Sequence, residues 1–532
     1  MIEFHRVTFT YPDGARPALR DVDIEVSEGE LALVVGATGS GKSTLLRAVN
    51  GLVPRFSGGN LAGRVVTAGR STDRTPVREM AETVGMVPQD PATGFVTETV
   101  EEELAYTMEQ LGLAPPVMRK RLEEILDLMG LAGLRSRPLS TLSGGEAQRV
   151  AIGSVLTAHP PVMVLDEPTS ALDPAAAEEV LSSLTRLVHD VGITVLVAEH
   201  RLERVVQYAD QVIHLDARGR VTMGDPKTVM EHSTVAPPVV HLARLLGWSP
   251  PPLTVRDARR RSADLRSRLS SGPPSKNVPP PDLATVERLS VWHGSTPAVR
   301  DVSLSVGAGE VVALMGRNGA GKSSLLWAIQ GSGPRRDGRV LVAGEDPAGR
   351  EPRDARRLVG LVPHNPADLL FMETVAQECD RADHTAAAPA GTCRALLARL
   401  VDGIEETAHP SDLSEGEKLA LVLAIQLSAR PRLLLLDEPT RGLDYGAKER
   451  LGSVLADLAA AGTGVVVATH DVEFVAAAAH RVVVLADGEV VADGPTPEVV
   501  VASPVFAPQI SKVMAPEPWL TTDEVAACLD ST

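Results

Sequence analysis

Two segments of the sequence have the residue types and spacing of a loop that binds phosphate. Residues 36–44 read Gly-Ala-Thr-Gly-Ser-Gly-Lys-Ser-Thr and lie between an apolar run, 31–35, and a helical pattern. In such a turn backbone N–H groups converge on phosphate oxygens, the lysine reaches the β and γ phosphates, and the next hydroxyl ligates Mg²⁺. Residues 316–324 repeat the pattern after another apolar run, 311–315. The expected contacts are Gly36, Gly39, Gly41, Lys42, Ser43, Thr44, Gly316, Gly319, Gly321, Lys322, Ser323 and Ser324.

Each half also contains an apolar strand pattern that ends in two acids. Asp166 and Glu167 end the first, and Asp437 and Glu438 end the second. Burying carboxylates at a strand end is costly unless they hold a metal ion or a proton, which favours a functional role. A histidine follows a later strand in each half, His200 in the first and His470 in the second. A single histidine at a strand end is more often structural, but its position after the acid pair favours function here.

Three further features fit a nucleotide site. Gln89 follows a short strand, 84–87, and can offer an amide oxygen to Mg²⁺ or to an attacking water. Tyr11 lies just past the first strand, where an edge aromatic and a ring that stacks on a nucleobase are equally good interpretations. Two helix starts have a serine that can cap the helix, and in the first the paired glycines also allow a phosphate to approach closely. Their expected contacts are Ser143, Gly144, Gly145, Glu146, Ser414, Gly416 and Glu417.

The periodicity of apolar residues predicts the strands and helices around these motifs. Residues 2–26 predict two strands with a turn at 12–14, and a helix runs from the phosphate loop to about residue 50. A β-rich stretch reaches residue 69, and residues 101–134 have a helical pattern. The second half repeats the order. The expected inner face of the helical pattern is Leu104, Leu111, Leu122, Ile125, Leu126 and Leu131.

Composition excludes several classes of protein. Basic residues number 52 and acidic residues 69, and the net charge of −17 argues against a protein that coats nucleic acid or an anionic lipid surface. The three cysteines lie far apart in sequence, which fits a reducing compartment and argues against a metal or disulfide framework. The first six residues lack the regions of a signal peptide, and no stretch approaches the ~18 apolar residues of a membrane-spanning helix.

The chain is long enough for two domains of similar size. We expect a first domain over 1–248, a linker over 249–283, a second domain over 284–500 and a C-terminal extension over 501–532. Proline clusters near 249–252 and 271–281 bracket an Arg-rich segment, 255–269, which predicts a proline-stiffened linker with one short helix. The extension has a helix signal at 522–526.

Together these ordered motifs resemble the nucleotide-binding domain of ABC ATPases, in two tandem copies that cover nearly the whole chain. The resemblance implies an α/β fold in which each copy has a RecA-like α/β core, an antiparallel β subdomain and an α-helical signature subdomain. It implies that Lys42, Ser43, Lys322 and Ser323 bind ATP and Mg²⁺. It further implies that Asp166 and Asp437, with Gln89, hold the metal, and that Glu167 and Glu438 polarise the water. By the same resemblance, His200 and His470 touch the γ-phosphate. Tyr11 and Trp292 are expected to stack on adenine.

Within that superfamily, residues 50–59 and 89–104 look like the energy-coupling-factor (ECF) importers of vitamins and metal ions, whose ATPase subunits are sometimes fused. This resemblance implies membrane partners, a transmembrane coupling protein and a substrate-binding membrane subunit, and a location on the cytoplasmic face of the membrane. It implies that the halves pair head to tail, with each ATP between one phosphate loop and the other half's signature. The expected docking surface follows each glutamine turn, at 95–104 and 371–378, although its apolar residues could equally belong to the core.

The second copy departs from the pattern at two positions. His364 stands where Gln89 stands, and Glu415 replaces Gly144. A carboxylate about 6 Å from the γ-phosphate would cost on the order of 3 kcal/mol at an effective dielectric near 20, but only if it points inward. An imidazole is a poor substitute for an oxygen ligand of Mg²⁺. We therefore expect two unequal sites, of which the Lys42 site hydrolyses ATP faster.

Two other classes of ABC protein fit the sequence less well than a transporter ATPase does. Tandem domains also describe ABC translation factors that bind ribosomes, but those have a long charged linker and a basic surface, whereas this linker is short and this chain acidic. DNA-repair ABC ATPases would need coiled-coil insertions or zinc cysteines, and the sequence has neither.

Overall fold

The computed structural model describes residues 1–530 except 13, 15, 171, 270–280, 402 and 504–505. The chain divides into two compact units, Met1–Ala258 and Arg259–Thr532. The division falls inside the expected linker, 249–283. The second proline cluster of that linker, as far as residue 280, and Ala171 lie outside the described residues, as does Asp13 of the expected turn. Among the described helices, none is long and apolar enough to cross a membrane.

A six-stranded sheet forms the centre of the first unit, in the order β10-β9-β3-β8-β7-β6. Strands β9, β3, β8, β7 and β6 run parallel, and β10 is antiparallel to β9. The three central strands are buried along their whole length, which explains their continuous apolar sequences. The strands are β3 Leu31–Val35, β6 Val84–Val87, β7 Val162–Asp166, β8 Thr194–Ala198, β9 Gln211–Leu215 and β10 Val221–Gly224.

A second, antiparallel sheet has the order β2-β1-β4-β5. Its inner side chains, such as Phe4 and Phe9, share one core with Leu45 and Leu46 of α1 and with residues of the central sheet. Helix α1 therefore packs between two sheets, and the phosphate loop that precedes it is held from both sides. The elements are β1 Ile2–Thr10, β2 Leu19–Val26, β4 Asn60–Thr67, β5 Arg70–Ser71 and α1 Lys42–Val49.

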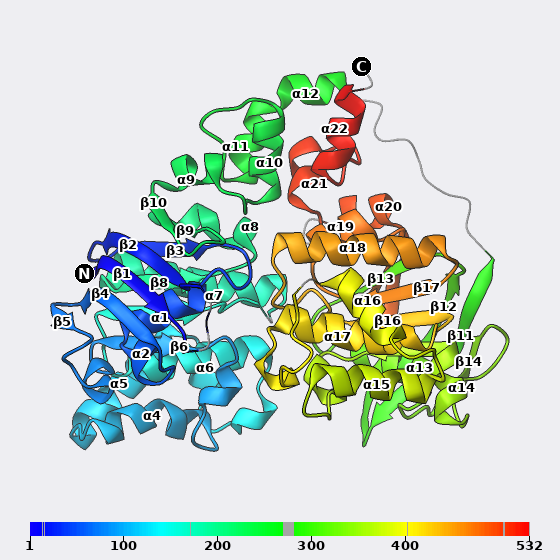
Figure 1. The fold of residues 1–532 in the computed structure, drawn as a ribbon, viewed down its shortest axis with the longest axis horizontal. Helices are drawn as coiled ribbons and strands as arrows, with labels where there is room; N and C mark the ends of the chain where they lie inside the picture. The colour runs from blue at the N-terminus through cyan, green and yellow to red at the C-terminus, as the bar shows by residue number, and fades with distance from the viewer. Residues whose placement is uncertain are drawn as a thin grey trace. The chain divides into compact units, whose positions relative to one another are not determined.

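The helical part of the first unit contains two helices where the sequence predicted one continuous pattern. Helix α4 ends at Gln110 and α5 begins at Pro115, because Gly112 adopts a positive φ between them. Leu111 falls in this break and is only partly buried. Figure 1 shows α4 and α5 at the opposite end of this unit from β10. The helices are α2 Leu52–Arg55, α3 Val77–Met80, α4 Val100–Gln110, α5 Pro115–Leu128, α6 Gly144–Leu156, α7 Pro174–Arg186, α8 Leu202–Val205, α9 Pro226–His232 and α10 Pro238–Leu245.

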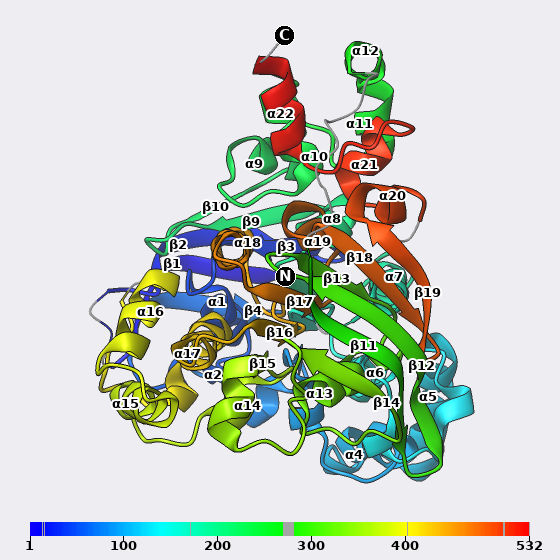
Figure 2. The same cartoon turned by 90° about the vertical axis from the view of Figure 1, so that its right-hand side faces the viewer.

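The second unit repeats this plan. Its six-stranded sheet has the order β15-β16-β17-β13-β18-β19, and its antiparallel sheet has the order β12-β11-β14. Figure 2 shows the long β11 and β12 strands beside β14. The predicted α/β architecture is therefore confirmed in both units. The strands are β11 Asp282–His293, β12 Thr296–Gly307, β13 Val311–Met315, β14 Asp337–Val342, β15 Val359–Val362, β16 Leu433–Asp437, β17 Gly464–Ala468, β18 Arg481–Ala486 and β19 Glu489–Pro495.

Helices cover the second unit's sheet in the same way. Leu325 and Leu326 of α13 belong to the core between the two sheets, while α17 and α18 pack on the other face. Cys379 and Cys393, which are 14 positions apart in sequence, meet in the helical part as free, buried thiols, and their hydrogen bond raises the pKa of Cys379. The helices are α13 Lys322–Gln330, α14 Pro352–Leu358, α15 Val375–Ala386, α16 Thr392–Leu400, α17 Glu415–Ser428, α18 Tyr445–Ala460, α19 Val472–Ala478 and α20 Thr496–Val501.

The linker and the C-terminal extension differ from the prediction. The linker contains two short helices rather than one, α11 Val255–Arg261 and α12 Ala263–Arg268, and the extension adds α21 Gln509–Met514 before α22 Thr522–Asp530. The indole N–H of buried Trp519 donates to the Leu269 carbonyl across 3.1 Å, and Arg259 donates to the Lys512 carbonyl. The extension is therefore tied to the linker by contacts that join residues about 250 positions apart.

Candidate nucleotide-binding and catalytic sites

Both phosphate loops connect the end of a central strand to a helix start. Gly39 and Gly41 adopt φ angles of 76° and 107°, and a Cβ at Gly41 would lie 2.5 Å from the Ala18 carbonyl oxygen. Only glycine fits there. The Nζ of Lys42 donates to the carbonyl oxygens of Gly36 and Ala37 across 2.9 and 3.0 Å, so the lysine is held over its own loop.

The acid pair of the first unit lies at the end of β7. Glu167 has a φ of 50°, an unfavourable angle for a residue with a side chain, and its N–H donates to the Ala198 carbonyl. The amide of Gln89 donates to Glu167 Oε2 across 2.9 Å, and His200 Nε2 lies 2.8 Å from Glu167 Oε1. The buried Glu167 carboxylate is thus contacted on both oxygens, and the residues predicted for this site come together in space.

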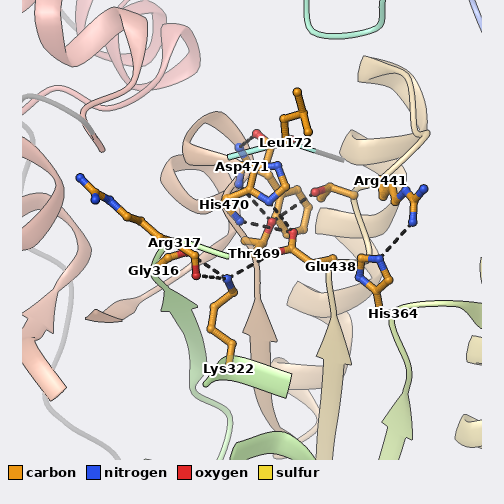
Figure 3. Close-up of polar contacts among 12 residues, drawn as sticks. Leu172, Gly316, Arg317, Lys322, His364, Glu438, Arg441, Thr469, His470 and Asp471 are labelled. Atoms are coloured by element: carbon orange, nitrogen blue, oxygen red, sulfur yellow. Dashed lines mark hydrogen bonds and ion pairs between the residues drawn. The ribbon is translucent and has the colours of Figure 1, made fainter. Parts of the chain in front are cut away.

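The second unit holds its glutamate differently. Glu438 has a φ of 51°, and its Oε2 lies 2.8 Å from Nδ1 of His470. Lys322 Nζ donates to the carbonyls of Gly316 and Arg317 and lies 3.7 Å from Glu438 Oε1. Figure 3 shows Lys322 and His470 at the Glu438 carboxylate. The glutamate here is approached by a cation and a histidine, with no bond from the side chain that corresponds to Gln89 among the described residues.

The aspartates have the environment of metal ligands. Burial raises the pKa of Asp166, and burial likewise raises the pKa of Asp437. Neither buried carboxylate oxygen of Asp437 has a partner with good hydrogen-bond geometry among the residues that the structure describes, although the Ser323 hydroxyl is near enough to oppose the effect of burial on the Asp437 pKa. An orphaned buried carboxylate is costly in free energy unless a cation meets it, and oxygen ligands are those that Mg²⁺ prefers. The residues present therefore fit a magnesium ion at the end of β16.

His364 is turned away from Glu438. Its Nε2 lies 3.0 Å from Nη1 of Arg441, the residue that follows the Asp-Glu-Pro-Thr sequence (Figure 3). In the first unit the residue at that place is the buried Ser170. The two glutamine-turn positions therefore make different contacts.

Both signature helices begin with a complete capping box. The pairs are Ser143 with Glu146 and Ser414 with Glu417, in which each serine hydroxyl accepts from the glutamate N–H and each glutamate accepts from the serine N–H. Gly145 also has a packing reason to be glycine, since a Cβ there would lie 2.8 Å from the Ala176 Cβ. The carboxylate of Glu415 lies 3.1 Å from Lys418 Nζ on its own helix.

The aromatic positions correct one expectation. The Tyr11 hydroxyl lies 2.9 Å from the Thr44 hydroxyl, and in the second unit His293 Nε2 lies 2.9 Å from the Ser324 hydroxyl. His293, rather than Trp292, therefore stands at the position of Tyr11. The Trp292 ring is covered by the Arg336 guanidinium, 4.4 Å from its centroid.

Sequence reasoning missed three residues at these sites. His293 could have been found by matching the two strands residue by residue, and Arg441 by comparing the residues after the two Asp-Glu-Pro-Thr sequences. Glu199, which precedes His200, is buried and accepts the Thr169 N–H across 2.7 Å, and burial raises its pKa. No sequence pattern marked Glu199.

Two phosphate loops, each with a strand-end acid pair and a histidine, define a tandem P-loop ATPase. A family model described as "ABC transporter" matches residues 19–170 and 299–441. A Streptomyces avermitilis protein, provisionally named an ABC transporter ATP-binding protein, is 59% identical over 560 residues, which cover 99% of this chain and all of that one. The chain belongs to the ABC transporter family. It is an ABC ATPase with two ATP-binding domains, and it hydrolyses ATP.

Other relatives extend the comparison. A Methanosarcina acetivorans protein with the same provisional name is 35% identical over 532 residues, covering 94% of this chain and 86% of that one. A solved structure, a model of ribosome-bound archaeal Pelota and ABCE1, matches with a TM-score of 0.65 at 20% identity, over 94% of this chain and 80% of that one. At this identity the match shows a shared fold and nothing about function.

Proposed function

We propose that this chain is the energy-coupling ATPase of an ECF-type membrane importer of the vitamin or metal-ion class. The contacts of Glu167 carry the catalytic part of the proposal, because Gln89 and His200 hold its buried carboxylate on both oxygens. The names of the full-length relatives support a transporter. The ECF assignment rests on the sequence resemblance of residues 50–59 and 89–104.

The side chains have distinct roles in hydrolysis. Lys42 and the α1 N-terminus bind the phosphates of ATP, and Glu167 orients the attacking water while His200 holds the glutamate. Asp166 with Ser43 and Gln89, and Asp437 with Ser323, would hold Mg²⁺, which neutralises phosphate charge when bound. We propose the same roles for Lys322, Glu438 and His470. We propose that Tyr11 stacks on the adenine base in the first unit and that His293 does so in the second.

The pairing of the two halves is part of the proposal and rests on the resemblance. Each ATP would lie between one phosphate loop and the other half's signature serine, so that ATP binding draws the halves together and hydrolysis releases them. The Lys42 site would then use Ser414 and Gly416, and the Lys322 site would use Ser143 and Gly145.

Membrane partners are required to turn this cycle into transport. We place the chain on the cytoplasmic face of the membrane, bound to a transmembrane coupling protein and a substrate-binding membrane subunit. The proposed docking turns expose one large apolar residue each, Val96 at 62% and Phe371 at 63%. Single exposed apolar residues are common on protein surfaces, so it is the matched position of these two, one in each proposed docking turn, that supports a covered surface in the assembly.

Cell fractionation tests the proposal. The full chain, produced in a cell that contains its membrane partners, should sediment with membranes and co-purify in detergent with multi-spanning proteins. The double variant V96D/F371D should lose membrane association while it still binds ATP. A chain that sediments with ribosomes at physiological salt, and not with membranes, would contradict the proposal.

A further inference from the structure

The turns that carry Gln89 and His364 have the same backbone anchor. Asp90 accepts the N–H of Ala92, and Asn365 accepts the N–H of Ala367. Gln89 and His364 therefore differ in the contacts of their side chains and not in the placement of their turns.

The residues that follow the two acid pairs are matched in the same way. The N–H of Ser170 donates to the Glu167 carbonyl and the N–H of Arg441 donates to the Glu438 carbonyl, both across 3.2 Å. Exchanging serine for arginine at this fixed position brings a guanidinium within 3.0 Å of His364. The second unit thus differs from the first at two matched positions, with His364 in place of Gln89 and Arg441 in place of Ser170. The two new side chains contact each other.

Only one assignment of donor and acceptor is possible for the contact between Arg441 and His364. Arginine only donates hydrogen bonds, so Nε2 of His364 must accept and the proton of the neutral ring must lie on Nδ1. The lone pair that an imidazole offers to a metal ion is then occupied by Arg441. Gln89 differs, because its amide nitrogen makes the bond to Glu167 and its oxygen is not used by that bond.

We propose that Arg441 is a positioning residue that withholds the His364 lone pair from the metal position beside Asp437. The second site therefore holds its metal with one protein ligand fewer than the first site. This inference rests on the proposed metal–nucleotide sites and adds a residue, Arg441, to which no role has been assigned. His364 also lies near Asp437, the proposed metal ligand of this site.

The choice of metal ion separates this proposal from a structural role for Arg441. Mg²⁺ prefers oxygen ligands and gains little from a freed imidazole, whereas Co²⁺ accepts imidazole readily. Replacing Arg441 by the serine of the matched position should therefore improve the binding of Co²⁺ and leave that of Mg²⁺ nearly unchanged. A merely structural loss would change both metal ions alike.

The experiment uses the full chain carrying K42A, so that nucleotide binding reports the Lys322 site. Fluorescence of mant-AMPPNP is titrated with Co²⁺ or Mg²⁺ in four variants, with K42A alone as the reference: R441S, H364A, R441S/H364A and R441S/H364Q. We expect R441S to lower the half-saturating Co²⁺ about tenfold or more, the scale on which a partner of a metal ligand acts. The R441S/H364A variant should lose that gain, and R441S/H364Q should lower the half-saturating Mg²⁺ about tenfold.

Two results would overturn the inference. One is an unchanged Co²⁺ requirement in R441S, checked with R441Q as a second variant, and the other is a gain that persists in R441S/H364A. A different result would overturn the proposed nucleotide site itself: K42A would bind no more mant-AMPPNP than K42A/K322A at any metal concentration. The two failures are therefore distinguishable.

Discussion

The amide of Gln89 donates to Oε2 of Glu167 across 2.9 Å and so ties the turn after β6 to the acid after β7. In the second unit the matched side chain, His364, bonds to Arg441. The two halves share a fold and hold their glutamates differently.

Replacing both glutamates, as E167Q/E438Q, should preserve ATP binding and slow hydrolysis by about 10²-fold or more, the scale of a positioned acid–base group. The glutamine retains the size of the side chain but loses the carboxylate that orients water. Equilibrium binding of ATP and steady-state release of phosphate measure the two effects separately. Loss of ATP binding or of the folded state would instead show that the carboxylates are structural.

The ring of Tyr11 should contribute to binding of the adenine base. Y11A should weaken ATP binding by about 1–3 kcal/mol, the scale of base–aromatic stacking, whereas Y11F keeps the ring and loses only the Thr44 contact. Tripolyphosphate, which has no base, provides the control and should bind equally well to all three proteins. If Y11A weakened tripolyphosphate as much as ATP, the tyrosine would act on the loop and not on the base.

Lys418 should shield the negative charge of Glu415. With Lys418 removed, as K418A, the carboxylate loses the partner 3.1 Å away, and ATPase activity should fall by up to about fivefold, the upper scale of an exposed ion pair. E415A/K418A should restore activity, because no charge remains to shield. A double variant as slow as K418A would show that Lys418 acts independently of Glu415.

Glu199 makes stability depend on pH with a defined sign. Burial raises the pKa of Glu199 above its ordinary value of 4.5, so over the interval between these values the folded chain keeps a proton that the unfolded chain has released. Stability then falls as pH rises through that interval. Gln in E199Q keeps an acceptor for the Thr169 N–H and has no proton to lose, so its urea midpoint should exceed that of the wild type by more at pH 8 than at pH 5. The exposed control E28Q should show no such trend, and a constant difference for E199Q would contradict the prediction.

The sequence could predict what depends on local order. Phosphate loops, buried strands and the acids at strand ends are each specified by a short continuous stretch of sequence. The sequence therefore predicts that Lys42 begins a helix and that Glu167 follows a buried strand, as the structure has them. Neighbouring residues of a strand point to opposite sides, so an error of one residue placed Trp292 where His293 stands. The contacts of His364 with Arg441 and of Trp519 with Leu269 join distant segments, and only the folded chain shows them.

The central claim is that the Lys42 site turns over faster than the Lys322 site, because Gln89 is bonded to Glu167 while His364 is bonded to Arg441. The most direct test compares the steady-state ATPase of the full chain with its membrane partners in the single variants E167Q and E438Q. We predict that E167Q removes most of the activity and that E438Q removes much less. Equal losses, or a larger loss in E438Q, would contradict the account.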